Sequence, residues 1–184
     1  MKGVIVEGPS DRAFVLELAK RLGLKVEVRI AGLSWRKIAA YAKELLSLGC
    51  EKVIILLDTH CRSAGDWREF VINRLREQNL AEKLKSGVVK VCLAVHALEA
   101  WLMADREALL KLIGREVKVP SSPEDYCQPD KVLDAAFCKA SGSRRRYYKG
   151  NLVDVRALAT LMNTRAAQRA CPSFAEFLIS LEDP

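Results

Sequence analysis

The sequence predicts an α/β fold, with a mainly parallel four-stranded sheet flanked by helices and a helical C-terminal extension. Short β-rich runs alternate with amphipathic helical patterns over the first two thirds of the chain, as in βαβ units with right-handed crossovers. The run 52–57 is apolar from its second residue on, as a central parallel strand covered on both faces should be. After Gly114, prolines separate helical stretches and we identify no further strand.

The first strand is predicted at 2–6, and a helix directly follows it. Ser10 is a suitable N-cap residue for this helix. Phe14, Leu18 and Leu22 recur every four residues, which places them on one helical face. This face is expected to pack against the sheet.

The second strand is predicted at 25–30, where side chains alternate in character. Ser34 is expected to cap the helix that follows, and Gly49 is typical of its C-terminal end. The inward positions of this helix are Ile38, Ala42, Leu45 and Leu46.

Two further strands, 52–57 and 88–95, complete the predicted sheet. Between them, Asp66 and Glu69 have capping-box-like spacing ahead of a helix. The buried face of that helix is expected to carry Phe70, Val71 and Leu75.

The rest of the chain is predicted to be helical. We expect an α/β core at residues 1–110 and a helical extension packed on it at 111–184. The helices are predicted around Trp101, around Leu109 and at 132–137, 155–162 and 174–181.

Composition narrows the class of protein. The 184 residues include 30 Lys and Arg against 23 Asp and Glu, a formal charge of +7, and this length suits one domain with its own core. The longest aliphatic run, Val53 to Leu57, is far shorter than the roughly 20 residues of a membrane span, so we expect no membrane association. The six cysteines include no CxxC pair, which favours mostly reduced thiols in a cytoplasmic protein.

Acidic residues follow three of the predicted strands. Glu7 closes the first strand, Asp58 closes the third, and Glu99 lies shortly after the fourth. Ligands of open parallel sheets bind at the carboxyl ends of the strands. Carboxylates that cluster there are best tolerated around a divalent cation. Because the ligands are oxygens, we expect Mg²⁺ or Mn²⁺. Taken singly, each acid also has an ordinary interpretation as a solvated strand end, turn or helix residue.

Several short motifs resemble a known family. Val4 to Asp11, followed by a helix, and Val53 to Asp58 resemble the Toprim domain of topoisomerases, primases and OLD-family (overcoming lysogenization defect) nucleases. The stretches Ala97 to Asp105, Tyr147-Tyr148-Lys149 and Pro172-Ser173-Phe174 are similar to a stand-alone Toprim-like family of unknown function related to the OLD nucleases. The resemblance implies a Toprim-like, Rossmann-like core.

The resemblance also implies roles for individual residues. Glu7 would be the Toprim glutamate, which acts in acid–base chemistry or holds a metal, and Asp58 the first aspartate of the DxD motif, a magnesium ligand. His60 stands where Toprim enzymes carry the second aspartate; it is a less certain metal ligand. Glu99 fits a later acidic motif, with metal binding as its expected role. A separate ATPase protein is an expected partner, because OLD nucleases carry an ATPase domain that this chain lacks.

A basic segment follows Asp134 and continues acid-free to Asp154. Its cations can contact backbone phosphates and its tyrosines can stack on unpaired bases, which predicts binding of DNA or RNA. The alternative is a solvated loop, because Ser141-Gly142-Ser143 precedes the arginines. The residues predicted to bind nucleic acid are Lys139, Arg144, Arg145, Arg146, Tyr147, Tyr148 and Lys149.

These observations predict a divalent-metal-dependent nuclease that hydrolyses phosphodiester bonds, with Glu7, Asp58 and Glu99 as catalytic residues. The alternative is a non-catalytic Toprim-like subunit that binds nucleic acid or an ATPase partner. A zinc site at His60, Cys61 and His96 is a weaker hypothesis, because adjacent His and Cys lack the usual ligand spacing.

Overall fold

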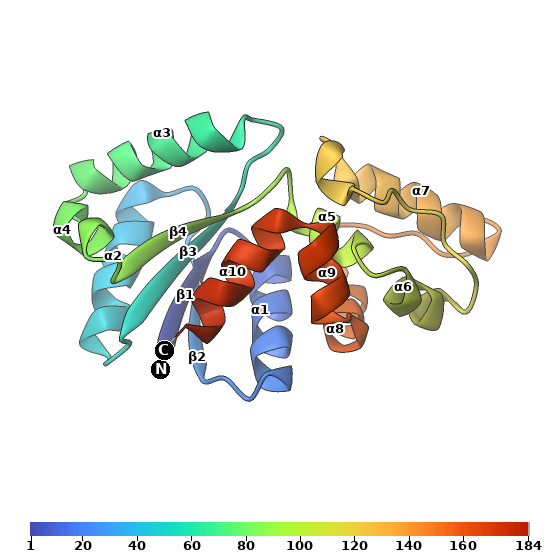
Figure 1. The fold of residues 1–184 in the computed structure, drawn as a ribbon, viewed down its shortest axis with the longest axis horizontal. Coiled ribbons are helices and arrows are strands. Elements are labelled where there is room, and N and C mark those ends of the chain that lie inside the picture. Colours follow the sequence, from blue (N-terminus) through green and yellow to red (C-terminus); the bar gives the residue numbers. More distant parts are fainter. Residues whose placement is uncertain (184) are drawn as a thin grey trace.

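Four parallel strands form the centre of the computed structural model, which describes residues 1–183 (Figure 1). Their order is β2-β1-β3-β4, and every neighbouring pair is parallel. The predicted α/β fold with a parallel four-stranded sheet is therefore confirmed. The strands are β1 (Lys2–Val6), β2 (Val26–Ile30), β3 (Lys52–Asp58) and β4 (Val89–Ala94).

Helices connect the strands and continue to the end of the described chain. Up to β4 they are α1 (Pro9–Arg21), α2 (Trp35–Ser47), α3 (Ala64–Glu77) and the short α4 (Ala81–Lys85). After β4 follow α5 (Leu98–Met103), α6 (Arg106–Ile113), the 3-10 turn η1 (Pro123–Asp125), α7 (Pro129–Ser141), α8 (Leu152–Leu161), α9 (Thr164–Ala170) and α10 (Pro172–Glu182). None of the helices in residues 1–183 is long and apolar enough to cross a bilayer.

Alternation along each strand divides the core between the two faces of the sheet. On β3, Ile54 and Leu56 belong to the cluster with Phe14 of α1. Ile55 and Leu57 belong to the other cluster, which α2 and α3 cover. This two-sided burial explains why β3 is apolar from Val53 to Leu57.

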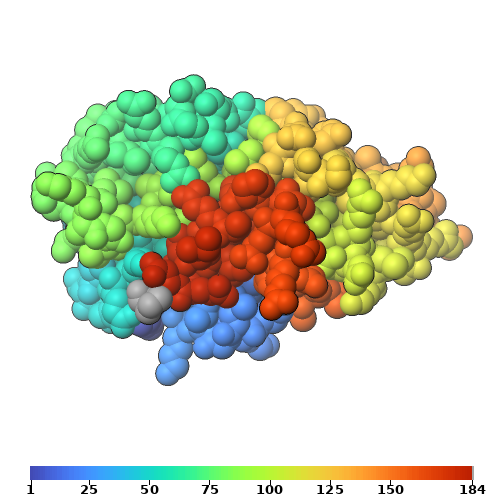
Figure 2. Space-filling view, in the orientation of Figure 1, coloured from blue at the N-terminus to red at the C-terminus, as the bar shows by residue number. Residues whose placement is uncertain are grey.

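Helix α10 returns to the sheet and packs against β3 and β4. Its Phe174 and Phe177 surround the buried Trp101 of α5 at centroid distances of 5.3 and 5.4 Å. Figure 2 shows this C-terminal segment lying over the centre of the visible face. Residues from both sides of the predicted 110/111 boundary thus share one core cluster.

The helix starts differ in part from those expected. Ser34 caps α2 as predicted. Ahead of α1, however, the residue at the N-cap position is Gly8, whose N–H donates to the Asp11 carboxylate at 2.8 Å. Ser63 caps α3 in place of Asp66, because a Ser hydroxyl three residues before an N–H can accept from it.

Phe70 of α3 was expected to be buried, but its side chain is 41% exposed. Trp67 is buried in its place, so the inward face of α3 is Trp67, Val71 and Leu75. The buried residues still recur every four positions, but the first of them is Trp67, about one turn before the predicted Phe70.

A disulfide bond joins Cys61, in the loop after β3, to Cys127, ahead of α7, with a Cα–Cα distance of 4.9 Å. This corrects the expectation of reduced thiols for these two residues. No sequence spacing indicated the bond, because the two loops meet only in the folded chain. The free cysteines are Cys50, Cys92, Cys138 and Cys171.

Gly3→Ala is expected to destabilise the protein by about 1 to 3 kcal/mol, because a Cβ there overpacks the core. That Cβ would lie 2.9 Å from Leu45 Cδ1 and 3.0 Å from Leu45 Cβ. Gly65→Ala is the matched control: its Cβ meets only Ser63 Oγ, at 3.9 Å, and alanine in a helix should stabilise by roughly 0.5 to 1 kcal/mol. Urea denaturation of both variants measures the two effects, and equal effects would contradict the packing argument.

Cys61→Ser is expected to lower the free energy of unfolding by roughly 2 to 4 kcal/mol, because the bond closes a loop across a sequence separation of 66. A dithiol reductant should lower the melting temperature of the wild type but leave that of Cys61→Ser unchanged. Cys138→Ser, which removes a free thiol, is the control. A wild-type melting temperature that reductant leaves unchanged would show that the bond adds no stability.

Candidate active site

Glu7 and Asp58 meet at the carboxyl edge of the sheet. The strands β1 and β3 are neighbours, and Glu7 Oε1 accepts the backbone N–H of Asp58 at 2.6 Å. Glu7 Oε2 lies 3.1 Å from His60 Nε2. One carboxylate therefore contacts both the end of β3 and the loop that follows.

Asp58 is held by the start of α5. Its Oδ1 accepts the backbone N–H of Leu98 at 3.2 Å. The neighbouring Glu99 is in the first turn of α5 and its side chain is 2% exposed. The β4–α5 junction thus brings the third predicted acid to the other two.

Lys149 supplies the positive charge between these acids. Its Nζ lies 3.5 Å from Glu99 Oε2 and 3.9 Å from Asp58 Oδ2. Burial works against the charge of Lys149, but the carboxylates of Glu99 and Asp58 outweigh it and raise the pKa of the ammonium. Lys149 is therefore a cation in the site.

Tyr147 orients Glu99. Its buried hydroxyl donates to Glu99 Oε1 at 3.0 Å. Burial, and then the charge of Glu99, raise the pKa of this hydroxyl well above its ordinary value. Tyr147 thus remains protonated as a hydrogen-bond donor.

Asp11 is a fourth acid of the cluster, which the sequence interpretation missed. Burial, together with the charges of Glu7 and Glu99, raises the pKa of Asp11 to about 6, although the Gly8 N–H and Lys149 oppose the shift. Burial, then Asp11 and Glu7, raise the pKa of Asp58 well above its ordinary value. The available signal was the spacing of Asp11 four residues after Glu7.

The loop 59–63 closes one side of the cluster. His60, Cys61 and His96 have positive φ angles of 47°, 65° and 64°, and the His60 N–H donates to the His96 carbonyl at 3.0 Å. Cys61 is committed to the disulfide, so the zinc hypothesis is wrong for this conformation. His96 Nδ1 is buried without a hydrogen-bond partner among the described residues.

The basic segment divides into three groups. Tyr147 and Lys149 reach the acidic cluster. Arg145 forms an ion pair with the buried Asp154 and donates to the Leu112 carbonyl at 2.8 Å. Arg146 forms a bidentate ion pair with Asp134. The two arginines therefore hold the C-terminal helices together.

The remaining members of the segment, Lys139, Arg144 and Tyr148, have exposed side chains. Among residues 1–183, none of the three forms an ion pair. Their side chains are accessible to a phosphate or a base and are not engaged in ion pairs within the described residues.

The donor set suits a hard divalent cation such as Mg²⁺ or Mn²⁺, because it consists of carboxylate oxygens. A cation there would also relieve the repulsion that raises the pKa of Asp58 and Asp11. Within residues 1–183, no group of three or more His, Cys, Asp or Glu is arranged as a metal site. Lys149 already neutralises Asp58 and Glu99, so metal binding requires these groups to rearrange and stays a prediction.

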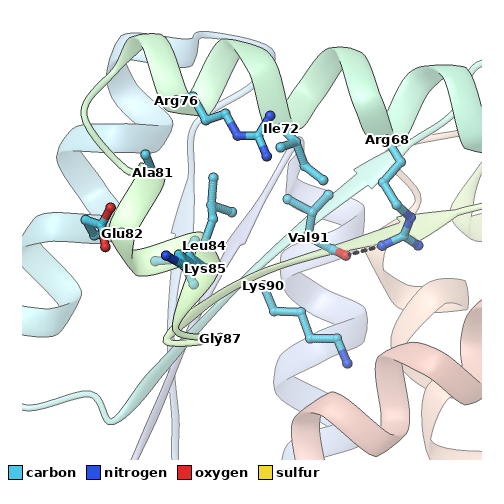
Figure 3. Close-up of a pocket in the computed structure, with 11 residues that line it drawn as sticks. Arg68, Ile72, Arg76, Ala81, Glu82, Leu84, Lys85, Gly87, Lys90 and Val91 are labelled. Carbon is cyan, nitrogen blue, oxygen red and sulfur yellow. Dashed lines mark hydrogen bonds between the residues drawn. The ribbon is translucent and has the colours of Figure 1, made fainter.

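A separate cavity of about 550 Å³ lies between α3, α4 and β4 (Figure 3). It adjoins Gly87 and Val89, at the amino end of β4. Arg68 crosses one side of it and donates to the Val91 carbonyl at 2.7 Å. This cavity is therefore remote from the acidic cluster at the carboxyl edge.

Asp11→Asn is expected to stabilise the protein at pH 7 to 8 by up to about 3 kcal/mol. The raised pKa of Asp11 in the folded chain means that the wild type loses stability as pH rises from about 4 through about 6. Asn can still accept the Gly8 N–H but has no charging cost. Thermal denaturation from pH 4 to 8 should show a difference that disappears at the acidic end. Asp125→Asn, at an exposed turn, is the control; a pH-independent difference would contradict the electrostatic explanation.

The comparison with protein families matches residues 6–182 to DUF4276, a domain of unknown function. Neither the comparison with curated proteins nor that with solved structures found a match. The family match includes β2, β3, β4 and every helix, but only the last residue of β1, Val6. The chain therefore belongs to the DUF4276 family.

Proposed function

We propose that the chain is a divalent-metal-dependent nuclease of the Toprim type that hydrolyses phosphodiester bonds in DNA or RNA. The observation that carries the proposal is the convergence of Glu7, Asp11, Asp58 and Glu99 around Lys149. Such a site combines cation-binding oxygens with a fixed ammonium, and both oppose the negative charge of a phosphodiester in its transition state. The Toprim-like motifs support the same assignment.

Asp58, Glu99 and Glu7 would hold Mg²⁺ or Mn²⁺, with His60 as a less certain ligand. When bound, such an ion neutralises the scissile phosphate and lowers the pKa of a water molecule. The chain's own contribution is to position the carboxylates: Leu98 N–H fixes Asp58, and Tyr147 fixes Glu99.

Lys149 is suited to contact the phosphate. Its side chain is 47% exposed although its ammonium faces two carboxylates. As the carboxylates take up a cation, the ammonium is free to turn to a phosphate oxygen as a point charge. This assigns Lys149 a role in binding the reacting group.

Glu7 and His60 are suited to move a proton. His60 Nε2 lies 3.1 Å from Glu7 Oε2, within the range for direct proton transfer between positioned groups. In this proposal His60 accepts the proton of the attacking water, and Glu7 stabilises the resulting imidazolium. The histidine at the position of the second Toprim aspartate would therefore supply a base in addition to, or in place of, a metal ligand.

The alternative is a non-catalytic subunit that binds nucleic acid or a separate ATPase protein. Lys149 favours it, because this residue neutralises Asp58 and Glu99 in the structure. A permanent internal cation would make the acidic cluster a structural ion-pair network. Cleavage assays distinguish the two functions.

The purified protein is expected to cleave single-stranded or duplex DNA or RNA in Mg²⁺ or Mn²⁺ and to lose activity in EDTA. Asp58→Asn, Glu99→Gln and Lys149→Ala should each lower the rate by about 100-fold or more, because the two carboxylates would hold the cation and Lys149 would oppose the charge of the reacting phosphate. Gel assays with end-labelled substrates measure the rates.

Lys83→Ala is the matched control, because Lys83 is an exposed cation of α4 outside both the acidic cluster and the basic segment. Unchanged cleavage in Asp58→Asn would contradict the assignment of catalysis to the acidic cluster. Metal-independent binding of nucleic acid with no cleavage under any condition would support the non-catalytic alternative.

A further inference from the structure

Three aromatic side chains gather where α2 and α3 begin. The rings of Trp67 and Phe70 are stacked, with centroids 5.2 Å apart and an angle of 12° between planes. Trp35 meets both rings edge-on, at 6.2 and 5.9 Å. Trp67 is 6% exposed and Phe70 is 41% exposed, so this cluster reaches from the core to the surface.

Guanidinium groups extend the stacked pair. Arg62 Cζ lies 4.2 Å from the centroid of the Trp67 ring, and Arg74 Cζ lies 5.1 Å from that of Phe70. Arg74 is also paired with Glu77. In the described part of the chain Arg62 has no acidic partner, so its charge is available to a ligand.

A cavity of about 500 Å³ opens over this cluster. It combines a stacking surface with a cation and one carboxylate at the start of α3. Its lining residues are Arg62, Ser63, Asp66, Trp67 and Phe70.

The cavity adjoins the acidic cluster through β3. The Trp67 Nε1–H donates to the Asp58 carbonyl at 3.0 Å in a buried contact. Arg62 is in the short loop that leaves Asp58 and contains His60, and the disulfide at Cys61 anchors that loop. A strand with a phosphate at the acidic cluster would therefore have a neighbouring nucleotide near Arg62.

We propose that this cavity is a nucleobase subsite, and that the substrate class is single-stranded nucleic acid; the assignment of the strand as substrate rests on the nuclease function proposed above. An unpaired base stacks on the Arg62 guanidinium and packs against the exposed part of the Phe70 ring. Asp66 accepts a hydrogen bond from an exocyclic amino group of the base. Arg62 also opposes the charge of the adjoining phosphate.

The charge of Arg62 disfavours the cationic ligands that bind aromatic sites in other proteins. Aromatic cages bind cationic ligands such as methylated ammonium groups, but Arg62 already lies against Trp67 and repels a cation. A planar ligand that carries an anionic group can stack on the aromatic side chains and also pair with the guanidinium. An unpaired nucleotide has this chemistry, whereas the bases of a duplex are stacked on one another.

Binding in EDTA tests the subsite without cleavage. The probes are fluorescently labelled oligonucleotides of about 12 residues, in the range of single-strand binding sites: single-stranded DNA, single-stranded RNA, duplex DNA, and an abasic single strand. Fluorescence anisotropy should show tighter binding of an ordinary single strand than of the abasic strand. Phe70→Ala should weaken single-strand binding by about 10-fold and leave abasic binding unchanged. Arg62→Ala should weaken single-strand binding by about 10-fold and abasic binding to a smaller extent, because the abasic strand keeps its phosphates.

Phe70→Trp, which keeps a stacking ring, should bind as the wild type does. Arg76→Ala is the matched control: it removes a cation from the other end of α3, in the cavity of Figure 3. Equal affinity for ordinary and abasic strands would overturn the subsite, as would unchanged single-strand binding in both Phe70→Ala and Arg62→Ala.

The outcomes separate this proposal from the nuclease proposal. Base-dependent binding that Phe70→Ala abolishes, in a protein that cleaves nothing, would support the subsite and reject the nuclease. Metal-dependent cleavage with base-independent binding would support the nuclease and reject the subsite.

Discussion

The structure around the carboxyl edge depends on one electrostatic constraint: four carboxylates share a confined space with a single lysine. Burial and mutual repulsion raise the pKa of Asp58 and Asp11, while Lys149 offsets part of the charge of Asp58 and Glu99. A fold optimised only for stability would separate such acids, because each buried charge costs solvation energy. Their convergence is the observation on which the proposal of a cation-binding and phosphate-binding site rests.

The C-terminal helices complete this site as well as covering the sheet. Tyr147 and Lys149 follow α7 and contact residues of α5 and β3. Arg145 and Arg146 hold the same segment in place through Asp154 and Asp134. The arginines of the basic segment thus position its tyrosine and lysine, and the charges that looked like a nucleic-acid surface act largely within the molecule.

The loop after β3 contributes residues to two neighbouring features of the surface. His60 contacts Glu7 of the acidic cluster, whereas Arg62 and Ser63 line the cavity over Trp67 and Phe70 that we propose as a nucleobase subsite. The hydrogen bond from Trp67 Nε1 to the Asp58 carbonyl connects the aromatic cluster to the end of β3. The two proposals therefore concern adjacent parts of one structural unit.

The local pattern of the sequence determined the strands, most of the helices and the three acids at strand ends, because alternation, helical periodicity and strand order depend on neighbours along the chain. It could not determine that Lys149 meets Glu99, that Cys61 bonds to Cys127, or that Phe70 is exposed and Trp67 buried. Those facts depend on how α3, the segment around α7 and the loop after β3 pack in the folded chain, and contacts between distant segments leave no periodic signal in the sequence. Asp11 lies between the two cases: its position beside Glu7 is local, but its raised pKa exists only because tertiary packing removes it from water and brings Glu99 near.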